Sequence, residues 1–487
     1  MVSRARNDRH NGGVNDYRDQ IRAAEARIER ATPANIPRDR RRDVSRPPGP
    51  SQVVSLTRLL NRGPATARFF LNLERDYQPL AHTRLAGQHL YILNDPEVII
   101  DVLLTRSRST MKGRGLQAAK ALLGNGLLTS ESDDHMRQRR LVQPAFHRER
   151  IAGYSLDMVR RAAQHSDMWR DGQQVEVVRD MSALTLAIVG DTLFRADLSG
   201  EAAEVGEALS GVLEGAGGRL LLGPAAMRVP TPGRRRALQS SARLEAVVAR
   251  LIAEHRSSGD TGDILSMLVA AQEDGTGMSD EQVRDEVMTL MLAGHETTAM
   301  TLSWTWLLLS GNPSVAAWWR QELDVLFADR DPTMADIASM PRTQAIVAES
   351  MRLFPPAWVM GRRLLADMEV GGHTLPSGAI VLTSMVALHR SERWWTNPHQ
   401  FVPTRWLGAN GSFDEGAPGQ PKGAWFGFGF GNRRCIGEQF AWTEAMLVMA
   451  TLGRRWTLER TSSTPVRLRP NITLRPTSDT TMVLRRR

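Results

Sequence analysis

One cysteine, Cys435, stands in a chain of 487 residues, inside a glycine-rich segment that runs from Phe428 to Gly437. A single cysteine cannot close an internal disulfide or build a cysteine-rich zinc or iron–sulfur site. Three interpretations remain: a buried apolar thiol, a nucleophile, or a single thiolate ligand to a metal. Cysteine thiolate is one of the axial ligands that proteins offer to haem iron.

The neighbours of Cys435 favour the metal-ligand interpretation. The backbone is expected to take positive φ, and so to approach a bulky partner closely, at Gly429, Gly431 and Gly437. A turn of this kind can aim N–H groups at the sulfur and stabilise its anion. Arg433 and Arg434 add positive charge beside it. A glycine-rich turn that holds a core cysteine is the alternative interpretation.

A long helix is predicted in the second half of the chain. The run from Ser279 to Gln282 has the pattern of a capping box, which starts a helix. The apolar pattern continues to Gly311, and Asn312-Pro313 ends it. A helix of about 32 residues is roughly 48 Å long. It should therefore cross the whole domain.

The middle of this helix holds a second candidate site. Gly294 weakens a helix by ~1 kcal/mol relative to alanine, which suggests close approach of the backbone to a flat ligand. Glu296 and Thr297 place a carboxylate beside a hydroxyl at the same point. An ordinary polar helix face is one alternative. A zinc-protease motif opened by His295-Glu296 is another, but its second histidine would fall at Ala299.

A possible ion pair lies in a third segment. Residues Ala345 to Phe354 are predicted to form a short helix that stops at Pro355-Pro356. Glu349 and Arg352 are three residues apart, so they share one face of this helix. The alternative is a surface ion pair worth about 0–1 kcal/mol.

Taken together, these segments resemble the cytochrome P-450 family, the haem-thiolate monooxygenases. The match to the family's haem-binding loop rests on Phe428, Gly431, Arg433, Cys435 and Gly437. The family motifs come in the expected order, as Glu296-Thr297, Glu349 with Arg352, Arg405 in Phe401–Trp406, and Cys435. The resemblance covers roughly residues 51–487. Within the family, the sequence is most similar to soluble bacterial members that oxidise terpenes.

The resemblance implies a cofactor and the residues that hold it. The cofactor is haem (heme b, iron protoporphyrin IX), with the thiolate of Cys435 as the axial ligand of the iron. Arginine binds carboxylates bidentately, and the two haem propionates are expected to be bound by His135, Arg139, Arg362 and Arg433. A solvated surface role is the alternative for each of these arginines taken singly.

The resemblance also implies two further sets of site residues. Thr297 and Glu296 are expected to be catalytic, the hydroxyl by hydrogen bonding during dioxygen activation and the carboxylate by helping to deliver protons. Glu349, Arg352 and Arg405 are expected to form a buried triad. Its role is structural, because it would hold the meandering chain that precedes Cys435.

The function implied is a monooxygenase that inserts one oxygen atom of O2 into a hydrophobic small molecule, a terpenoid of secondary metabolism. Its electrons would come from a separate ferredoxin or flavodoxin with an NAD(P)H reductase. Fatty-acid or other natural-product hydroxylation, a haem-thiolate peroxygenase or isomerase, and a non-enzymatic haem sensor remain as alternatives. The expected pocket-lining segments are 107–126, 199–235, Leu292-Ala293, Ala357–Met360 and Pro476–Met482.

Composition bounds the remaining questions. The net charge is +9, and the 62 basic residues are mostly dispersed among 53 acidic ones, as on an ordinary solvated surface rather than a nucleic-acid interface. The sequence contains no P-loop and no nucleophile elbow. Absence of disulfides fits a reducing compartment, so a cytoplasmic location is expected.

The predicted fold is mainly α with small β-sheets, in one domain over residues 51–487. Successive amphipathic helices are expected from about Gly124 to Leu326, after a hairpin between Pro79 and Leu93 and a helix that starts at Asp95-Pro96. Residues 1–50 carry 12 arginines against 7 acidic residues and are expected to form a basic, flexible extension. No run of 18 apolar residues occurs, so no transmembrane anchor is expected.

Overall fold

The computed structural model describes residues 46–60, 64–85, 88–198, 232–258, 262–273, 278–416, 418–477 and 479–487. Within these ranges the chain is mainly helical with small β-sheets, which confirms the predicted fold class. Residues 1–45 of the predicted extension and residues 199–231 of a predicted pocket segment lie outside the described part.

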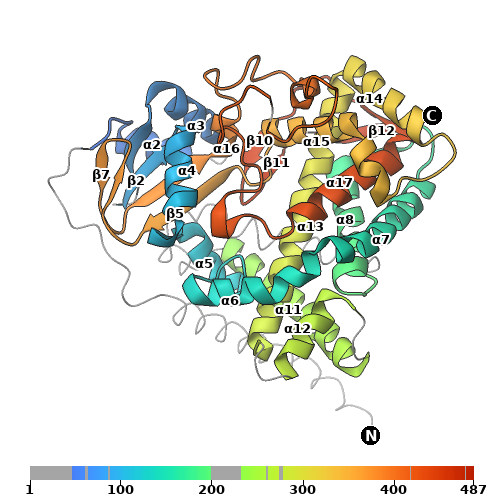
Figure 1. The fold of residues 1–487 in the computed structure, drawn as a ribbon, viewed down its shortest axis with the longest axis horizontal. Helices are drawn as coiled ribbons and strands as arrows, with labels where there is room; N and C mark the ends of the chain where they lie inside the picture. Colours follow the sequence, from blue (N-terminus) through green and yellow to red (C-terminus); the bar gives the residue numbers. More distant parts are fainter. Residues whose placement is uncertain are drawn as a thin grey trace, which may run out of the picture.

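Helix α13 (Asp280–Gly311) runs through the body of the molecule (Figure 1). The hydroxyl of Ser279 accepts a hydrogen bond from the N–H of Gln282, and the Gln282 side chain accepts one from the N–H of Ser279. This capping box satisfies donors that the first helical turn leaves unpaired. The helix has 32 residues and ends at Asn312, so its predicted bounds are confirmed.

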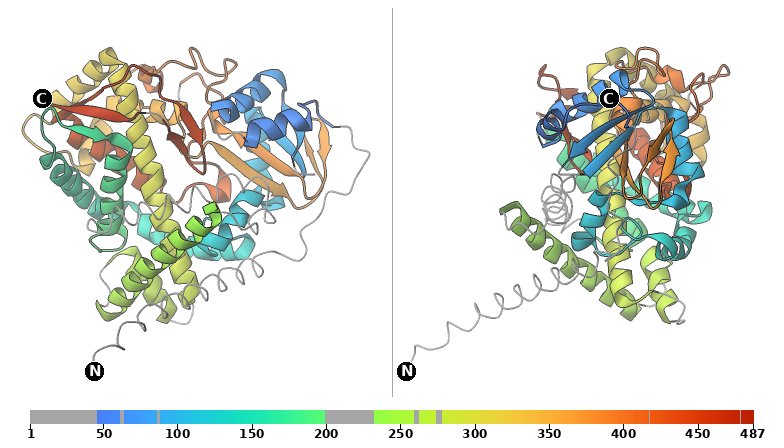
Figure 2. Two further views of the ribbon diagram at one scale, coloured as in Figure 1. Left: turned by 180° about the vertical axis from the view of Figure 1, so that it is seen from behind. Right: turned by 90° about the vertical axis from the view of Figure 1, so that its left-hand side faces the viewer.

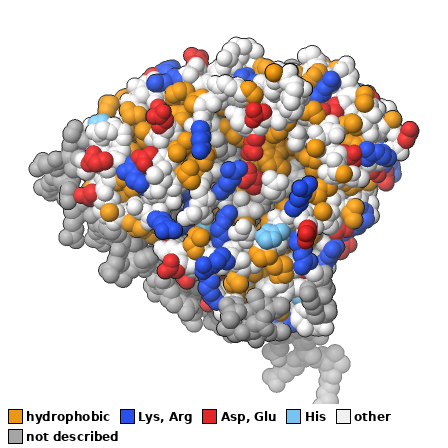
Figure 3. Space-filling model, in the orientation of Figure 1, with side chains coloured by type: hydrophobic (Ala, Val, Ile, Leu, Met, Phe, Trp, Pro, Cys, Tyr) orange, Lys and Arg blue, Asp and Glu red, His pale blue; other side chains and the backbone are white. Residues whose placement is uncertain are grey.

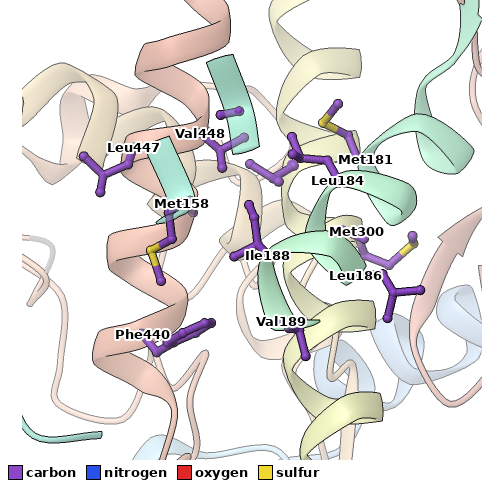
Figure 4. Packing of buried hydrophobic residues seen from close by; sticks show 14 of the residues in the cluster. Met158, Met181, Leu184, Leu186, Ile188, Val189, Met300, Phe440, Leu447 and Val448 are labelled. Carbon is purple, nitrogen blue, oxygen red and sulfur yellow. The ribbon is translucent and has the colours of Figure 1, made fainter. Parts of the chain in front are cut away.

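Three other helices form the central core together with α13. They are α7 (Arg148–Asp167), α8 (Val177–Leu193) and α17 (Glu438–Gly453); α8 packs along α13, and α17 packs against α7 and α13. The close-up of this core shows apolar side chains from the four helices converging (Figure 4). Four that are fully buried there are Met158, Ile188, Met300 and Val448. This packing fixes the centre of α13 relative to the helix that follows Cys435.

The remaining helices complete the body. They are α2 (Gln52–Leu60), α3 (Pro64–Asp76), α4 (Pro96–Ile100), α5 (Arg114–Leu123), α6 (Ser132–Val142), α11 (Pro232–Ser258), α12 (Ile264–Glu273), α14 (Pro313–Leu326), α15 (Pro341–Leu353) and α16 (Met385–Leu388). The expected start at Asp95-Pro96 is confirmed by α4, which Asp95 caps. The expected start of α15 at Ala345 is wrong by four residues, because Pro341 occupies the first turn, where proline suits a helix.

Short turns of other helix types join these elements. They are the π-helical η1 (Asp101–Thr105) and the 3-10 turns η2 (Ser107–Ser109), η3 (Gln143–Phe146), η4 (Met334–Ser339), η5 (Pro403–Trp406) and η6 (Gly431–Arg433). The last of these turns belongs to the segment that carries Cys435.

The largest sheet has the strand order β1-β2-β8-β5-β3. Its strands are β1 (Leu80–Leu85), β2 (Gln88–Leu93), β3 (Thr110–Lys112), β5 (Val359–Leu364) and β8 (Ile380–Ser384). The pair β1 and β2 is the predicted antiparallel hairpin, and β2 pairs with β8 in parallel. The edge strand β3 pairs antiparallel with β5, which sets Lys112 opposite Arg362.

Three smaller sheets use short strands. They pair β4 (Gln174–Glu176) with β12 (Thr481–Arg486) and β9 (Trp456–Arg460), β6 (Met368–Val370) with β7 (His373–Leu375), and β10 (Leu468–Pro470) with β11 (Leu474–Pro476). Strand β4 interrupts the run of helices predicted from Gly124 to Leu326. It forms because its backbone groups pair with those of β12 near the C-terminus.

The β-rich region and the helical body lie at opposite sides of the molecule, with α2 and α3 beside the large sheet (Figures 1 and 2). On the face seen in Figure 3, basic side chains are interspersed with acidic and apolar ones, as the composition suggests. None of the helices in the described ranges is long and apolar enough to cross a membrane.

Candidate haem-thiolate site

The cysteine segment is a tight turn that leads directly into α17. Its backbone reverses at Gly429 (φ +77°) and Gly431 (φ +61°), a conformation in which other residues are strained. A Cβ on Gly431 would lie 3.1 Å from the carbonyl oxygen of Leu103, so this glycine also permits close packing. The expectation of positive φ at Gly437 is wrong, because this residue is the N-cap of α17 with φ −87°.

The thiol of Cys435 sits at the positive end of a helix in a setting that opposes its ionisation. The turn is closed by a hydrogen bond of 2.9 Å from the N–H of Cys435 to the carbonyl oxygen of Phe428. The backbone N–H of Gly437 is bonded to the sulfur and lowers its pKa. The side chain is exposed, yet the protein around it raises the pKa of the thiol to about 11 by desolvation. A stable thiolate therefore needs a metal cation in contact with the sulfur.

The two arginines expected near the sulfur behave differently. Arg434 forms an ion pair with Glu438, the first residue of α17, so a carboxylate offsets much of its charge. Arg139 reaches over from α6 and donates a hydrogen bond of 2.8 Å to the carbonyl oxygen of Arg434. Burial lowers the pKa of Arg139, and the nearby Cys435 raises it. The structure thus ties α6 to the cysteine turn.

A cationic cluster lies beside this turn and consists of Lys112, His135, Arg139, Arg362 and Arg433. Lys112 and Arg362 are direct cross-strand neighbours on β3 and β5, and both are buried. Like charges directly opposite one another destabilise a sheet. Lys112 donates hydrogen bonds of 2.7 Å to the carbonyl oxygens of Leu127 and Ser130, and burial followed by repulsion from Arg433 lowers its pKa to about 6.

Lys112 was not among the residues that the sequence singled out. It is one of only three lysines in a chain with 62 basic residues, and this rarity was the available signal. Its position next to Arg362 follows from the pairing of β3 with β5, which are about 250 residues apart in the chain. No local pattern in the sequence contains that pairing.

The other members of the cluster reinforce the positive potential. Burial, and after it repulsion from Lys112, Arg433, Arg139 and Arg362, lower the pKa of His135 to about 3. Burial also lowers the pKa of Arg362 to about 10, with a contribution from Arg433. Arg433 donates a hydrogen bond of 3.1 Å to the carbonyl oxygen of Ser130 and pairs with Glu131. In the described ranges, Glu131 is the carboxylate that forms an ion pair with this cluster.

This donor set fits a haem. Around neutral pH the cluster holds three guanidinium groups, from Arg139, Arg362 and Arg433, against the carboxylate of Glu131. Two further carboxylates, such as the propionates of a haem, would offset that positive charge, and arginine pairs well with carboxylates. His135 is neutral at this pH and has an N–H to donate. The thiol of Cys435 lies next to Arg139, so ligand and cluster are close enough to serve one cofactor.

The helix site on α13 differs in part from the expectation. Ala293 is exposed in the middle of the helix, and Thr297 lies one turn further along on the same face. The hydroxyl of Thr297 donates a hydrogen bond of 2.7 Å to the carbonyl oxygen of Ala293. A Cβ on Gly294 would lie 3.2 Å from the side chain of Val189, so the close approach at this glycine is to α8. The expected approach to a flat ligand does not explain Gly294.

Glu296 is turned away from the face that carries Thr297. Its carboxylate is buried and accepts two hydrogen bonds of 2.7 Å from Arg475 and one of 2.7 Å from Thr473. Successive residues on a helix point about 100° apart, so adjacency in sequence does not bring the carboxylate to the hydroxyl. Thr473 and Arg475 lie almost 180 residues further along the chain, and no sequence pattern linked them to Glu296.

The third set of residues comes together in a buried network. Glu349 and Arg352 are both fully buried on α15 and form two hydrogen bonds of 2.8 Å. Arg405 donates a hydrogen bond of 3.1 Å to Glu349, and Trp406, which the sequence did not indicate, donates one of 2.9 Å. The network thus joins α15 to η5 and satisfies a carboxylate that would be costly to bury alone.

Arg352 also holds the irregular chain between α16 and η5. Its guanidinium donates hydrogen bonds to the carbonyl oxygens of His389 (2.5 Å), Pro398 (2.8 Å) and Gln400 (3.1 Å). In the same region, the N–H of Val402 donates to Glu349 at 3.0 Å. These contacts support the path of the chain that precedes the cysteine turn.

Two residues expected to line an apolar substrate pocket are buried by protein instead. Leu292 is 4% exposed, whereas its neighbour Ala293 is exposed. Trp358 is 5% exposed, packs edge-on against Phe70, and donates a hydrogen bond of 2.7 Å to the carbonyl oxygen of Asn471. Val359 and Met360 remain partly exposed.

Comparison with known proteins gives consistent matches over this architecture. The family model described as cytochrome P-450 matches residues 47–482. Cyclooctatin synthase of Streptomyces melanosporofaciens is 40% identical, over 81% of this chain and 86% of its own. Cyclooctat-9-en-7-ol 5-monooxygenase of the same organism is 36% identical, over 88% and 92%. Pentalenene oxygenase of Streptomyces avermitilis is 32% identical, over 84% and 90%.

Proposed function

We propose that this chain, which belongs to the cytochrome P-450 family and is a monooxygenase, oxidises a terpenoid of secondary metabolism. The observation that supports the substrate class is the similarity to three bacterial proteins named for cyclooctatin, cyclooctat-9-en-7-ol and pentalenene. The partly exposed Val359 and Met360 and the exposed Ala293 offer apolar surface that suits such a ligand.

In this proposal the thiolate of Cys435 would bind the haem iron, and the cationic cluster would hold the haem propionates. When bound, the haem supplies the reductive activation of dioxygen and the oxidation of the substrate. The protein's contribution at this side is to hold the sulfur at the N-terminus of α17, to keep an N–H of Gly437 on it, and to anchor two carboxylates with His135, Arg139, Arg362 and Arg433. Lys112 joins that anchor in the proposal.

On α13, Thr297 is the proposed proton-handling hydroxyl. Its hydrogen bond to the carbonyl of Ala293 leaves the oxygen lone pairs free to accept a further hydrogen bond. Glu296 would help to move protons only after its carboxylate exchanges Arg475 or Thr473 for water. We therefore assign the positioning of the transferred proton to Thr297 and its supply to Glu296.

The electrons are proposed to come from a separate ferredoxin or flavodoxin with its NAD(P)H reductase. The support for this is that the family match spans residues 47–482. The proposed location with these partners is the cytoplasm.

A substrate-binding scan tests the proposal. Purified, haem-loaded protein is titrated with cyclic terpenes, terpene alcohols and fatty acids while the haem spin state is followed by absorbance. Compounds that bind are then incubated with ferredoxin, reductase and NADPH, and products are identified by mass spectrometry. We expect spin-state shifts and hydroxylated products with terpenoids. A response confined to fatty acids would replace the terpenoid assignment, and turnover only with added hydrogen peroxide would favour a peroxygenase.

A further inference from the structure

A pocket lies between the C-terminal part of α13, the end of α15 and the chain that follows α16. Its volume is about 430 Å³, which falls in the usual range for small-molecule sites. Leu308, Leu353, Phe354 and Phe401 supply apolar wall. None of the residues proposed above to hold the haem lines it.

Arg390 is the one charged side chain fixed in the interior of this pocket. It is only 8% exposed, and its guanidinium stacks on the ring of Phe354 with the central carbon 5.0 Å from the ring centroid. Among the described residues, one of its five N–H donors forms a hydrogen bond, a long one of 3.3 Å to the carbonyl oxygen of Val386. Within the described ranges no carboxylate lies within ion-pair distance of it. A buried guanidinium normally has such a partner.

The charges around Arg390 make this lack of a partner more costly. Glu349 is the nearby carboxylate that favours the Arg390 cation, but it is already shared by Arg352 and Arg405. The guanidinium groups of Arg352, Arg390 and Arg405 thus share the single carboxylate of Glu349. Burial first, and then repulsion from Arg352, lower the pKa of Arg390 to about 9. An anion in the pocket would restore the balance.

The mouth of the pocket is open to an approaching ligand. His399 and Gln400 are exposed and lie at its edge, whereas Leu353 and Phe401 are buried deeper in its wall. Asn312, which ends α13, completes the lining. The pocket therefore has a polar rim, apolar sides and a single buried cation.

We propose that this pocket binds a small amphipathic carboxylate, with its head group on Arg390 and its apolar body against Leu308, Phe354 and Phe401. A carboxylate suits a guanidinium because the two groups can form two parallel hydrogen bonds. A phosphate or other multiply charged anion fits less well, because the pocket holds one guanidinium and half of its lining residues are apolar. The proposal does not depend on the identity of the substrate oxidised at the haem.

The pocket is also linked to the helix that carries Thr297. Phe354, on which Arg390 stacks, lies face to face with Trp304 of α13, with ring centroids 3.9 Å apart and planes 6° apart. Trp304 is two turns beyond Thr297 on the same helix. A ligand in the pocket would thus press on a side chain that packs directly against the central helix.

Calorimetric titration of the complete, haem-loaded protein with octanoate tests the proposal. We expect one site per chain, and no change in the haem absorbance spectrum as it fills. Octan-1-ol, which has the same apolar body without the charge, should bind at least about tenfold more weakly, as loss of a charge-assisted hydrogen bond predicts. Arg390→Met should weaken octanoate binding to the level of octan-1-ol.

A milder pair of variants keeps the test decisive if Arg390→Met does not fold. Gln400→Glu places a negative charge at the mouth and should weaken octanoate several-fold at low salt without affecting octan-1-ol. Gln52→Glu makes the same change on the exposed surface of α2, outside the pocket, and should leave both unchanged. Leu308→Trp should fill the pocket and abolish binding of both ligands.

Three results would overturn the proposal. One is no octanoate binding at millimolar concentration, which would mean that water alone solvates Arg390. Another is octanoate binding that shifts the haem spectrum and is displaced by imidazole, because it would place the ligand at the haem. The third is that Gln400→Glu and Gln52→Glu weaken the binding of octanoate equally, which would show only a general effect of surface charge.

Discussion

At the scale of single residues, Cys435 combines an exposed side chain with surroundings that disfavour its anion. Desolvation raises the pKa of the thiol to about 11, and the N–H of Gly437 only partly opposes this. A metal that binds the sulfur must therefore displace a proton. The free energy needed to remove this proton from the thiol falls as the pH rises.

Haem loading should consequently depend on pH through Cys435. Below its pKa of about 11 the metal-free thiol is protonated, so thiolate ligation releases one proton, and the haem affinity of the wild type relative to Cys435→Ser should rise about tenfold per pH unit. The measurement is titration of haem-free protein with haemin between pH 6 and pH 8. Cys435→Ser is the reference, because both proteins share the proton uptake that the haem propionates cause at Lys112. The variant should lack the thiolate spectrum of the reduced, CO-bound protein, and a retained thiolate spectrum would refute the ligand assignment.

The role of Thr297 can also be tested with a single substitution. Its hydroxyl bonds only to its own helix in the described structure, so Thr297→Ala should fold and bind haem normally. Consumption of NADPH should continue, with less hydroxylated product and more hydrogen peroxide per electron pair. Thr301→Ala is the matched control, because its hydroxyl makes the equivalent bond one turn further along, to the carbonyl of Thr297. If both variants formed the same amount of hydroxylated product per electron pair, the proton-handling role would pass from Thr297 to Thr298 or to ordered water.

At the scale of elements, the ends of two helices and one buried network position the site. The capping box at Ser279 sets the start of α13, and Gly437 opens α17 immediately after the cysteine turn. The irregular chain between α16 and η5 has no helix or strand of its own to hold it. Its carbonyl groups are instead bound by Arg352, so the side-chain network does there what a ladder of backbone hydrogen bonds does elsewhere.

Removing Arg352 should therefore unfold this region rather than slow a chemical step. Arg352→Ala leaves the carboxylate of Glu349 with less compensation and three carbonyl groups without a donor, which should cost about 3–5 kcal/mol. We expect little folded, haem-loaded protein, measured as haem absorbance per mole of purified chain. Arg148→Ala on the exposed surface of α7 is the control and should change stability by less than about 0.5 kcal/mol. Normal haem content in Arg352→Ala would contradict the structural role of Arg352.

At the scale of the whole molecule, the cationic cluster makes the folded state sensitive to pH and to its ligand. The folded chain lowers the pKa of Lys112 from its ordinary 10.5 to about 6. Between these values the unfolded chain binds the proton and the folded chain does not, so stability rises with pH. His135, whose pKa falls to about 3, has finished titrating by about pH 6.5, and Cys435 acts only above about pH 9.

The contribution of Lys112 to the stability of the haem-free protein should accordingly grow from pH 7 to pH 8.5 by up to about 1.4 kcal/mol per pH unit, measured as the difference between the wild type and Lys112→Met. The buried carboxyl groups of Glu286 and Glu444, whose pKa values burial raises, act in the opposite direction in both proteins. Urea denaturation at constant ionic strength measures this dependence. Haem loading should flatten the slope, because its propionates favour the charged form of Lys112. Lys112→Met should lack this contribution without haem. A slope that persists unchanged in Lys112→Met would assign the effect to other groups.

The sequence alone determined what depends on neighbours along the chain. The isolated Cys435 in its glycine-rich turn, the capping box at Ser279 and the spacing of Glu349 and Arg352 are local patterns, and they were enough to predict the family, the mainly helical fold and the length of α13. Helix caps, turns and same-face pairs are set by residues within a few positions of one another. They can therefore be read without a tertiary structure.

The tertiary structure decided which distant groups meet. Strand pairing placed Lys112 beside Arg362, the fold of the C-terminal strands turned Glu296 towards Arg475, and the chain after α16 left Arg390 in a pocket without a carboxylate. Each pair of groups is separated by more than a hundred residues or depends on a surface built from several elements. The burial of these groups and the electrostatic repulsion between them arise only when distant segments pack together, so no local sequence pattern indicates them.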